Sequence, residues 1–335
     1  MNNSKVQLNK RKDLNKWYTR IPRHFRTSAA STFRMMSSFA PAIGLMTPPS
    51  RPQGISAIVR VKDEEAWLAP SLRSISSAVD EIIVGDNGST DSTPNILDAL
   101  KKELGNQLTV LKRPEADIKD LTNNLIDQTR FRWILKWDAD YVAKTDGPNP
   151  ISNLREWLLN LDPKRYFLVY PTMIELCGDL FHQRTTTPTR ADCNCFTFSP
   201  KLHYVYDRHG WEAPLVPIWY RVLKYDTPTF YHVDVKPTVR MFLSFLWKRY
   251  LGTPDRDRFR NFQDYVSQTR QKEWQDRTGE EMAELWALEH FRGLAPYDHD
   301  RFGDYPSLLK PFLKNSPYRL LYRDGQIIGR QESGK

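Results

Sequence analysis

The chain has 335 residues, of which 40% are hydrophobic, 12% aromatic and 27% charged. This composition excludes a disordered or collagen-like chain. No uninterrupted apolar run reaches the roughly 18 residues of a membrane span, so we do not expect an integral membrane enzyme.

The net charge of +9 comes from the N-terminal segment 1–53, which has ten Lys or Arg residues and one acid, Asp13. Residues 54–335 have 39 basic and 39 acidic residues and are therefore neutral. We expect 1–53 to be a flexible basic arm. A solvated tail, a contact with anionic lipid, nucleic-acid binding and a transit-like presequence are all compatible with it.

Three cysteines, Cys177, Cys193 and Cys195, are too few for a disulfide framework and fit a reducing compartment. We therefore expect a cytoplasmic protein. Zinc binding by Cys193 and Cys195 with His182 or His203 is one alternative. A C-x-C without a second cysteine pair is a weak zinc signal, so buried strand thiols are the preferred interpretation.

Regular elements begin at Gly54, where short β-branched runs alternate with apolar residues at helical spacing. The predicted elements are strand 55–61, helix 67–75, strand 80–85, helix 95–103, strand 108–112, helix 121–128 and strand 132–137. Strands that alternate with helices predict βαβ crossovers and a largely parallel sheet flanked by helices.

The second half of the sequence is less regular. Its predicted elements are helix 151–161, strands 165–173, 195–199, 219–223 and 229–233, helices 238–250, 258–275 and 279–292, and a hairpin over 318–329 that turns at Asp324-Gly325. We thus predict an α/β domain over 54–235 and a mostly helical C-terminal extension over 236–335.

Acidic residues follow three of the predicted strands: Asp63 and Glu64 the first, Asp86 the second, and Asp138 and Asp140 the fourth. Ligands of open parallel sheets bind beyond these strand ends. A carboxylate there can accept from a uracil N–H or from ribose hydroxyls. Two carboxylates one residue apart in an extended segment point the same way and can share a hard cation that holds a diphosphate.

The Asp-x-Asp triplet is not specific by itself, since composition predicts roughly two by chance and the chain has three. Only Asp138 and Asp140 end an apolar strand. The triplets at 255–257 and 298–300 lie among Arg, Pro, His and Tyr, where a solvated charge cluster is expected. The first triplet is therefore the candidate functional one.

Three segments resemble the ordered signatures of a known enzyme family: VRVKDEEAWLAPSLRSI, DEIIVGDNGSTDST and WILKWDADYV. They are similar to the motifs of family-2 glycosyltransferases with the GT-A fold, in particular the branch related to lipopolysaccharide-core glucosyltransferases. The resemblance covers about residues 55–250. It implies a Rossmann-like GT-A fold with a mixed, largely parallel sheet, and a hexosyltransferase of polysaccharide or glycan biosynthesis.

The resemblance also implies roles for the residues at the strand ends. Val61 and Glu64 would border the nucleoside, Asp86 would face the base, and Asp138 would meet the ribose or the metal. Asp140 would bind the metal, Mn²⁺ or Mg²⁺.

Three neighbouring positions need separate comment. The chain has Asp63 where the family usually has Asn, which adds a charge. Ser89 and Asp91 fit a helix cap as well as a direct donor contact.

Two later residues also match family positions. Glu212, in Gly210-Trp211-Glu212, corresponds to an acceptor-side carboxylate and is the candidate general base. Trp211 replaces the usual His and either stacks on a sugar or is buried in a loop core. His232 resembles a late histidine that completes the metal shell, with core packing as an equal alternative.

The family-2 resemblance implies that a sugar is transferred in one displacement, with inversion at its anomeric carbon. The donor is a nucleotide-sugar, here a UDP-sugar, and the acceptor is a glycan, a lipid-linked molecule or a protein. Peripheral contact with an anionic membrane through 1–53 fits a lipid-linked acceptor.

Three other functions are weighed against this one. A processive synthase would carry membrane spans and a Q-x-x-R-W motif after the triplet, whereas Gln128–Trp133 is one residue too long and precedes Asp138. A sugar-nucleotide nucleotidyltransferase would open on a Gly-rich loop, and no Gly occurs from Ile55 to Val84. A non-catalytic polyanion binder would use the basic arm, but the neutral remainder argues against a nucleic-acid partner.

Overall fold

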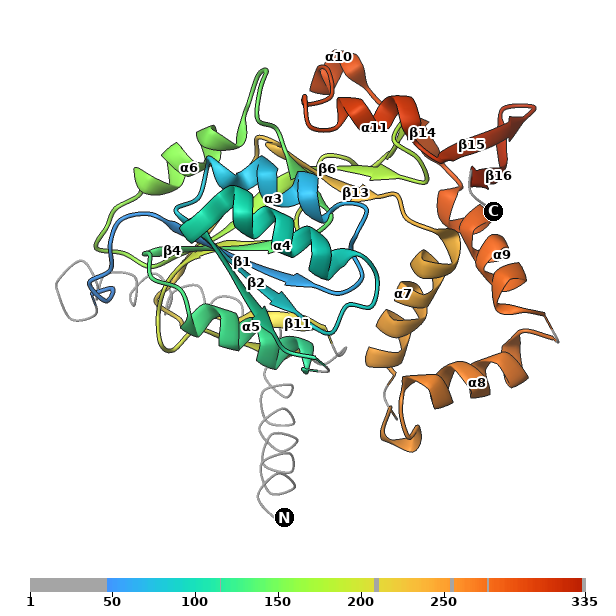
Figure 1. Ribbon diagram of the computed structural model, residues 1–335, viewed down its shortest axis with the longest axis horizontal. Coiled ribbons are helices and arrows are strands. Elements are labelled where there is room, and N and C mark those ends of the chain that lie inside the picture. Colours follow the sequence, from blue (N-terminus) through green and yellow to red (C-terminus); the bar gives the residue numbers. More distant parts are fainter. Residues whose placement is uncertain (1–46, 115, 208–210, 254–255, 276, 333–335) are drawn as a thin grey trace, which may run out of the picture.

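A mixed 12-stranded sheet forms the centre of the protein, in the order β14-β7-β6-β9-β4-β1-β2-β3 with further strands paired at its side (Figure 1). The structure is a computed structural model, and it describes residues 47–332 except 115, 208–210, 254–255 and 276. Predictions for residues 1–46 lie outside the described residues.

The first half of the fold is a parallel α/β unit. Its elements are β1 (Ile55–Val61), α3 (Leu68–Ser76), β2 (Glu81–Asp86), α4 (Thr93–Leu104), β3 (Leu108–Lys112), α5 (Ile118–Asp127) and β4 (Trp133–Asp138). Strand β1 pairs in parallel with both β2 and β4. Because side chains alternate along a strand, Val59 packs against α3 and α4 on one face, whereas Ile58 packs against α5 on the other.

The second half adds strands of both directions. They are β5 (Tyr141–Ala143), β6 (Phe167–Cys177), β7 (His182–Arg184), β8 (Thr189–Arg190), β9 (Cys195–Thr197), β12 (Arg221–Tyr225) and β13 (Phe230–Asp234), with α6 (Ile151–Leu159) before β6. Strand β9 lies between β4 and β6 and is antiparallel to both. A separate antiparallel pair, β10 (His203–Tyr206) and β11 (Glu212–Leu215), lies beside α5.

The C-terminal part contains α7 (Thr238–Leu251), α8 (Phe262–Glu273), α9 (Gly279–Phe291), β14 (Leu294–Pro296), α10 (His299–Phe302) and α11 (Lys310–Asn315), followed by β15 (Tyr318–Arg323) and β16 (Gln326–Glu332). Helices α7, α8 and α9 lie at one side of the sheet in Figure 1. Strand β14 pairs with β7, so the extension is joined to the central sheet.

The predicted fold class is confirmed: the protein is a mixed α/β protein with a central, mostly parallel sheet flanked by helices. The predicted hairpin turns at Asp324 and Gly325, both with positive φ. Helix α5 begins earlier than predicted because the Asp117 side chain accepts from the backbone N–H of Lys119 and Asp120. Helix α8 begins later than predicted, after the capping residue Asn261.

The cysteines are buried and free. Cys193 and Cys195 are completely buried in the core and belong to no group of metal-ligand atoms among the described residues. The buried-thiol interpretation therefore holds, and the zinc alternative has no support from the described part of the chain. None of the helices within the described ranges is long and apolar enough to cross a membrane.

Residues 47–53 pack on the α/β domain. The Arg51 guanidinium donates to Thr129 Oγ1 at 2.9 Å and to the Phe131 carbonyl at 3.1 Å, and it lies 3.2 Å from the centroid of the Phe198 ring. The Pro52 carbonyl accepts from the Arg132 N–H at 3.0 Å. The described end of the segment 1–53 is thus part of the folded domain.

Candidate active site

Two loops at the carboxyl ends of β1 and β2 are tied together by polar contacts. The Asp63 carboxylate accepts from the Thr90 N–H at 2.6 Å, and the Asp63 N–H donates to Ser89 Oγ at 2.9 Å. The Glu64 N–H donates to Thr93 Oγ1 at 2.8 Å. Asp63 therefore positions the loop before α4, and it adopts a φ of 53°, which Asp tolerates better than most residues.

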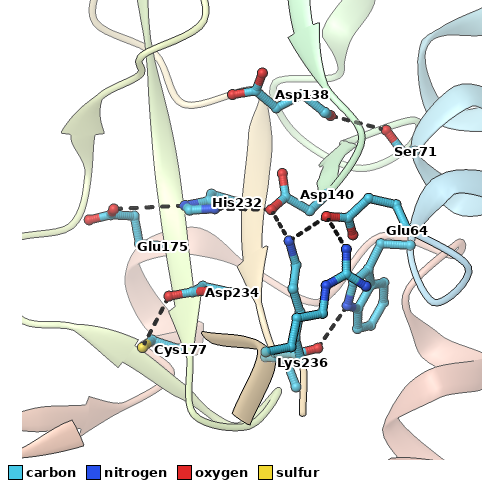
Figure 2. Close-up of polar contacts among 12 residues, drawn as sticks. Glu64, Ser71, Asp138, Asp140, Glu175, Cys177, His232, Asp234 and Lys236 are labelled. Carbon is cyan, nitrogen blue, oxygen red and sulfur yellow. Dashed lines mark hydrogen bonds and ion pairs between the residues drawn. The ribbon is translucent and has the colours of Figure 1, made fainter. Parts of the chain in front are cut away.

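The side chains of Glu64 and Asp140 meet at Lys236, which lies just after β13 (Figure 2). Lys236 Nζ donates to Glu64 Oε1 at 2.8 Å and to Asp140 Oδ2 at 2.7 Å. Arg240 forms a second ion pair with Glu64 Oε1, at 2.9 Å. Burial would raise the pKa of Asp140, but Lys236 and His232 lower it well below its usual range.

The same effects, burial and neighbouring charges, shift the pKa of Glu64 in the opposite direction from that of Asp140. Burial, together with the nearby Asp140 carboxylate, raises the pKa of Glu64 above its ordinary value despite Lys236 and Arg240. Glu64 Oε2 is buried and has no hydrogen-bond partner. This oxygen is therefore available to a donor group that the protein itself does not supply.

His232 lies between two carboxylates, as Figure 2 shows. Its Nε2 is 3.4 Å from Asp140 Oδ2, and its Nδ1 is 3.9 Å from Glu175 Oε1. Burial would lower the pKa of His232, but Asp140, Glu175 and Asp234 raise it to about 10. The ring also packs edge-on against Tyr141, with centroids 5.1 Å apart. The imidazole thus has both a polar and a packing role.

Asp138 points away from Lys236 in Figure 2. Its Oδ1 lies 3.5 Å from Lys136 Nζ and 3.9 Å from Arg60 Nη2, and its side chain is 31% exposed. Burial of the carboxyl would raise the pKa of Asp138, but Lys136 and Arg60 lower it. The carboxylate is therefore ionised and accessible at the end of β4.

Asp86 and Val61 are register partners at the ends of β2 and β1. Both are buried, and Asp86 Oδ1 accepts from the Ser89 N–H at 2.9 Å. The Val61 carbonyl accepts from the Asn87 N–H at 2.9 Å. These two residues form the floor of the loop region, and among the described contacts they do not touch Lys236.

Glu212 begins β11 and forms an ion pair with Arg60, whose Nη1 lies 2.6 Å from Glu212 Oε2. Its other oxygen accepts from the Thr122 hydroxyl of α5. Arg60 thus connects Glu212 with Asp138. The neighbouring Trp211 is 48% exposed, so its predicted alternative of burial in a loop core is wrong. Gly210 lies outside the described residues.

Three basic residues at this site were not predicted from the sequence: Arg60, Lys236 and Arg240. Lys236 and Arg240 follow β13 and face acids that lie far away in the sequence. No motif indicates them. The one available signal was the presence of isolated bases directly beside predicted strand ends.

The donor atoms at Asp140 and His232 suit a divalent metal, which accepts carboxylate oxygen and imidazole nitrogen. Glu64, which shares the Lys236 ammonium with Asp140, adds a buried carboxylate oxygen without a hydrogen-bond partner, Oε2. These residues therefore fit a divalent metal ion, although the Lys236 ammonium contacts Asp140 Oδ2 at 2.7 Å.

A second group of ligand-type atoms consists of Cys177, Asp234 and His290, which all lie within 4.8 Å of one another. The Arg184 guanidinium contacts all three, at 3.3 Å from Cys177 Sγ and 3.9 Å from Asp234 Oδ2. A cationic side chain thus already neutralises this group, as Lys236 does at Asp140.

Comparison with known proteins adds the enzyme class. Residues 56–149, which contain the strand-end carboxylates, match the family described as Glycosyl transferase family 2. The protein is a glycosyltransferase, and its residues 56–149 are similar to the family 2 domain. No curated protein matches it in a sequence search.

Solved structures are similar to this glycosyltransferase at low identity. One is S. aureus TarS 1-349 in complex with UDP-GlcNAc, with 12% identity, a TM-score of 0.40, and coverage of 84% of this chain and 97% of that chain. Another is the mannosyltransferase PcManGT from Pyrobaculum calidifontis in complex with GDP-Man and Mn²⁺, with 12% identity, a TM-score of 0.39, and coverage of 87% and 89%.

Proposed function

We propose that this glycosyltransferase is an inverting, metal-dependent hexosyltransferase that uses a nucleotide-sugar donor, a UDP-sugar, and an acceptor hydroxyl. The supporting observation is the position of Glu64, Asp138 and Asp140 after the carboxyl ends of β1 and β4, inside the segment that matches the family. Parallel α/β sheets bind their ligands at this edge.

The donor is proposed to lie across the ends of β1, β2 and β4. Val61 and Glu64 border the nucleoside, Asp86 accepts from the base, and Asp138 accepts from the ribose or binds the metal. The exposed, ionised carboxylate of Asp138 supports this assignment, as does the unpartnered oxygen of Glu64.

Asp140 and His232 are proposed to hold the divalent cation, Mn²⁺ or Mg²⁺. When bound, such a cation supplies Lewis-acid stabilisation of the leaving diphosphate. Asp140 contributes a carboxylate whose pKa is lowered, so it is ionised at all physiological pH values. His232 contributes its Nε2, which faces Asp140 Oδ2 at 3.4 Å and must be deprotonated to bind the cation, although Asp140, Glu175 and Asp234 raise its pKa.

Glu212 is proposed to be the general base that accepts the proton of the acceptor hydroxyl. In a single displacement the base lies across the anomeric carbon from the diphosphate, which excludes the carboxylates of the donor site. Glu212 lies on β11, apart from the donor loops, yet it is joined to Asp138 through Arg60.

The remaining parts of the proposal, on domains, family branch, location and acceptor, rest on the sequence. We propose a catalytic domain over 54–235, an extension over 236–335, and a place in the branch related to lipopolysaccharide-core glucosyltransferases. We further propose a cytoplasmic enzyme that acts on a glycan, lipid-linked or protein acceptor, with peripheral contact of segment 1–53 with anionic membranes.

A donor screen tests the proposal. Melting temperature and donor hydrolysis are measured with UDP-, GDP- and ADP-sugars, in Mn²⁺ and in chelator. We expect a UDP-sugar to give the largest stabilisation, and hydrolysis to stop in chelator. Full activity in chelator would overturn the metal dependence, and equal stabilisation by all nucleotides would overturn the donor assignment.

Two variants separate the metal ligands from structural residues. Asp140→Asn should reduce transfer by a hundredfold or more, roughly the effect of losing one charged transition-state interaction. His232→Ala should raise the Mn²⁺ concentration needed for half-maximal activity. If His232→Ala instead lowers stability and leaves the Mn²⁺ requirement unchanged, the imidazole is a packing residue.

A further inference from the structure

Lys236 occupies the position between the two carboxylates that face the proposed metal. Its Nζ lies 2.8 Å from Glu64 Oε1 and 2.7 Å from Asp140 Oδ2 (Figure 2). The same Asp140 oxygen faces His232 Nε2 at 3.4 Å. The ammonium therefore contacts the oxygen on which a cation held by Asp140 and His232 would bind.

The backbone around Lys236 is held in place from two sides. The Trp67 indole N–H, at the start of α3, donates to the Val235 carbonyl at 2.8 Å. The Arg330 guanidinium, on β16, donates to the Lys236 carbonyl at 2.7 Å. Because these contacts fix the connection between β13 and α7, the Lys236 side chain is directed into the carboxylate pair, where only 14% of it is exposed.

A divalent ion and an ammonium compete electrostatically for one carboxylate oxygen. A metal ion lies about 2.1 Å from its carboxylate ligand, and two positive charges so close together on the same oxygen repel each other. The Lys236 ammonium therefore opposes binding of the ion at Asp140 Oδ2, and the ion binds most tightly when Lys236 leaves this oxygen. The ammonium retains Glu64 as a partner when this happens.

We propose that Lys236 is a built-in counter-cation of the donor site, which competes with the divalent ion for Asp140 and thereby sets the affinity of the enzyme for that ion. The inference rests on the proposed assignment of Asp140 as a metal ligand. In the metal-free enzyme, Lys236 holds Glu64 and Asp140 in place through its two contacts. When the ion binds, the ammonium gives up its contact with Asp140 and keeps its contact with Glu64.

Arg240 provides the matched control for Lys236. It also forms an ion pair with Glu64, at 2.9 Å, and donates to the Lys62 carbonyl at 3.0 Å. Among the described residues, Arg240 forms no ion pair or hydrogen bond with Asp140. Removal of Arg240 thus takes one positive charge from the same cluster without removing the competitor at Asp140.

The experiment measures the binding of Mn²⁺ alone to the full chain, by the loss of the free-ion signal in electron paramagnetic resonance. Wild type is compared with Lys236→Met, Arg240→Met and Asp140→Asn. We expect Lys236→Met to bind Mn²⁺ roughly tenfold more tightly, because the binding-competent state is no longer depleted by the ammonium. Arg240→Met should change the affinity by less than about threefold, and Asp140→Asn should abolish binding.

Two results would contradict the inference in distinguishable ways. If Asp140→Asn abolishes Mn²⁺ binding but Lys236→Met binds the ion no more tightly than wild type, Lys236 does not compete with the ion. The assignment of Asp140 as a metal ligand is then still supported. If Asp140→Asn binds Mn²⁺ as wild type does, the metal assignment itself is wrong, and the inference with it. Should Lys236→Met fail to fold, Lys236→Gln, which keeps a donor but no charge, gives the same comparison.

Discussion

Arg60 Nη1 lies 2.6 Å from Glu212 Oε2, and Nη2 of the same guanidinium lies 3.9 Å from Asp138 Oδ1. Arg60 is on β1, Asp138 ends β4, and Glu212 begins β11, so one side chain connects the proposed base with a donor-site carboxylate. The Thr122 hydroxyl donates to the second oxygen of Glu212. Both oxygens of the proposed base are thus engaged by donors of the protein itself.

The first prediction concerns Glu212→Gln, which keeps the shape of the side chain and removes its basicity. We expect retained binding of the donor and a loss of transfer of about a thousandfold, the range for removal of a general base. Donor binding by thermal shift and transfer rates measure the two effects separately. Thr122→Val is the control, since it removes the neighbouring hydroxyl but leaves the carboxylate.

A near-normal transfer rate in Glu212→Gln would contradict the assignment and would direct attention to Asp192 or Asp207, two other carboxylates in the stretch that leads to Glu212. A loss of stability without a selective loss of transfer would show that Glu212 serves as the counter-ion of Arg60. The side chain is only 10% exposed, so this structural role is a definite alternative outcome.

The second prediction concerns the base-facing position. UDP with Mn²⁺ should stabilise the wild type by about 2.7 kcal/mol at a hundredfold excess over Kd, and Asp86→Ala should remove most of that gain. Ser89→Ala is the control, because it disturbs the same loop by removing the acceptor of the Asp63 N–H but keeps the Asp86 carboxylate. An undiminished UDP effect in Asp86→Ala would exclude Asp86 from the nucleotide site.

The strand ends could be predicted from the sequence because their signals are local. The β-branched run before Lys62 and the turn formers after Asp86 fix where β1 and β2 end, and the carboxylates follow within a few residues. The contact between Lys236 and Asp140 spans 96 residues and depends on how β13 enters the sheet. Local periodicity carries no information about such a contact, nor about the placement of β9 between β4 and β6.

The third prediction concerns Asp63, whose role the sequence left open. Asp63→Ala should cost about 1–2 kcal/mol, because the Thr90 N–H loses its acceptor and Ala adopts a φ of 53° less readily than Asp. Asp63→Asn should remain close to wild type, since the amide oxygen still accepts and Asn tolerates this conformation. Chemical unfolding measures both. Loss of UDP binding in Asp63→Asn would instead indicate a direct role of the charge.

The fourth prediction concerns Asp179, which anchors the C-terminal hairpin. Its carboxylate accepts from the Leu320 N–H at 2.9 Å and the Phe181 N–H at 2.8 Å, and it pairs with His182 at 2.6 Å. Burial would raise the pKa of Asp179, but these contacts lower it. Asp179→Ala should therefore destabilise the protein by about 3 kcal/mol at neutral pH.

The pH dependence of this effect follows from the direction of the shift. A lowered pKa stabilises the fold above the ordinary carboxyl pKa of about 4, and this stabilisation is lost as the pH falls through the lowered value. The difference between wild type and Asp179→Ala in urea unfolding should thus be full at pH 7 and smaller at about pH 3. Asp226→Ala is the control, because its ion pair with Lys224 is exposed and contributes little.

The fifth prediction locates the boundary of the basic arm. Deletion of 1–46 should leave donor hydrolysis and melting temperature unchanged and should weaken binding to anionic vesicles in a salt-sensitive way. Deletion of 1–53 should in addition lower stability by about 1–3 kcal/mol, because Arg51 loses its contacts with Thr129 and Phe131 and the Arg132 N–H loses its acceptor. Arg51→Met in the full chain isolates the guanidinium contribution.

A large stability loss on deletion of 1–46 alone would show that the arm packs on the domain. Equal vesicle binding with and without the arm would exclude the proposed membrane contact.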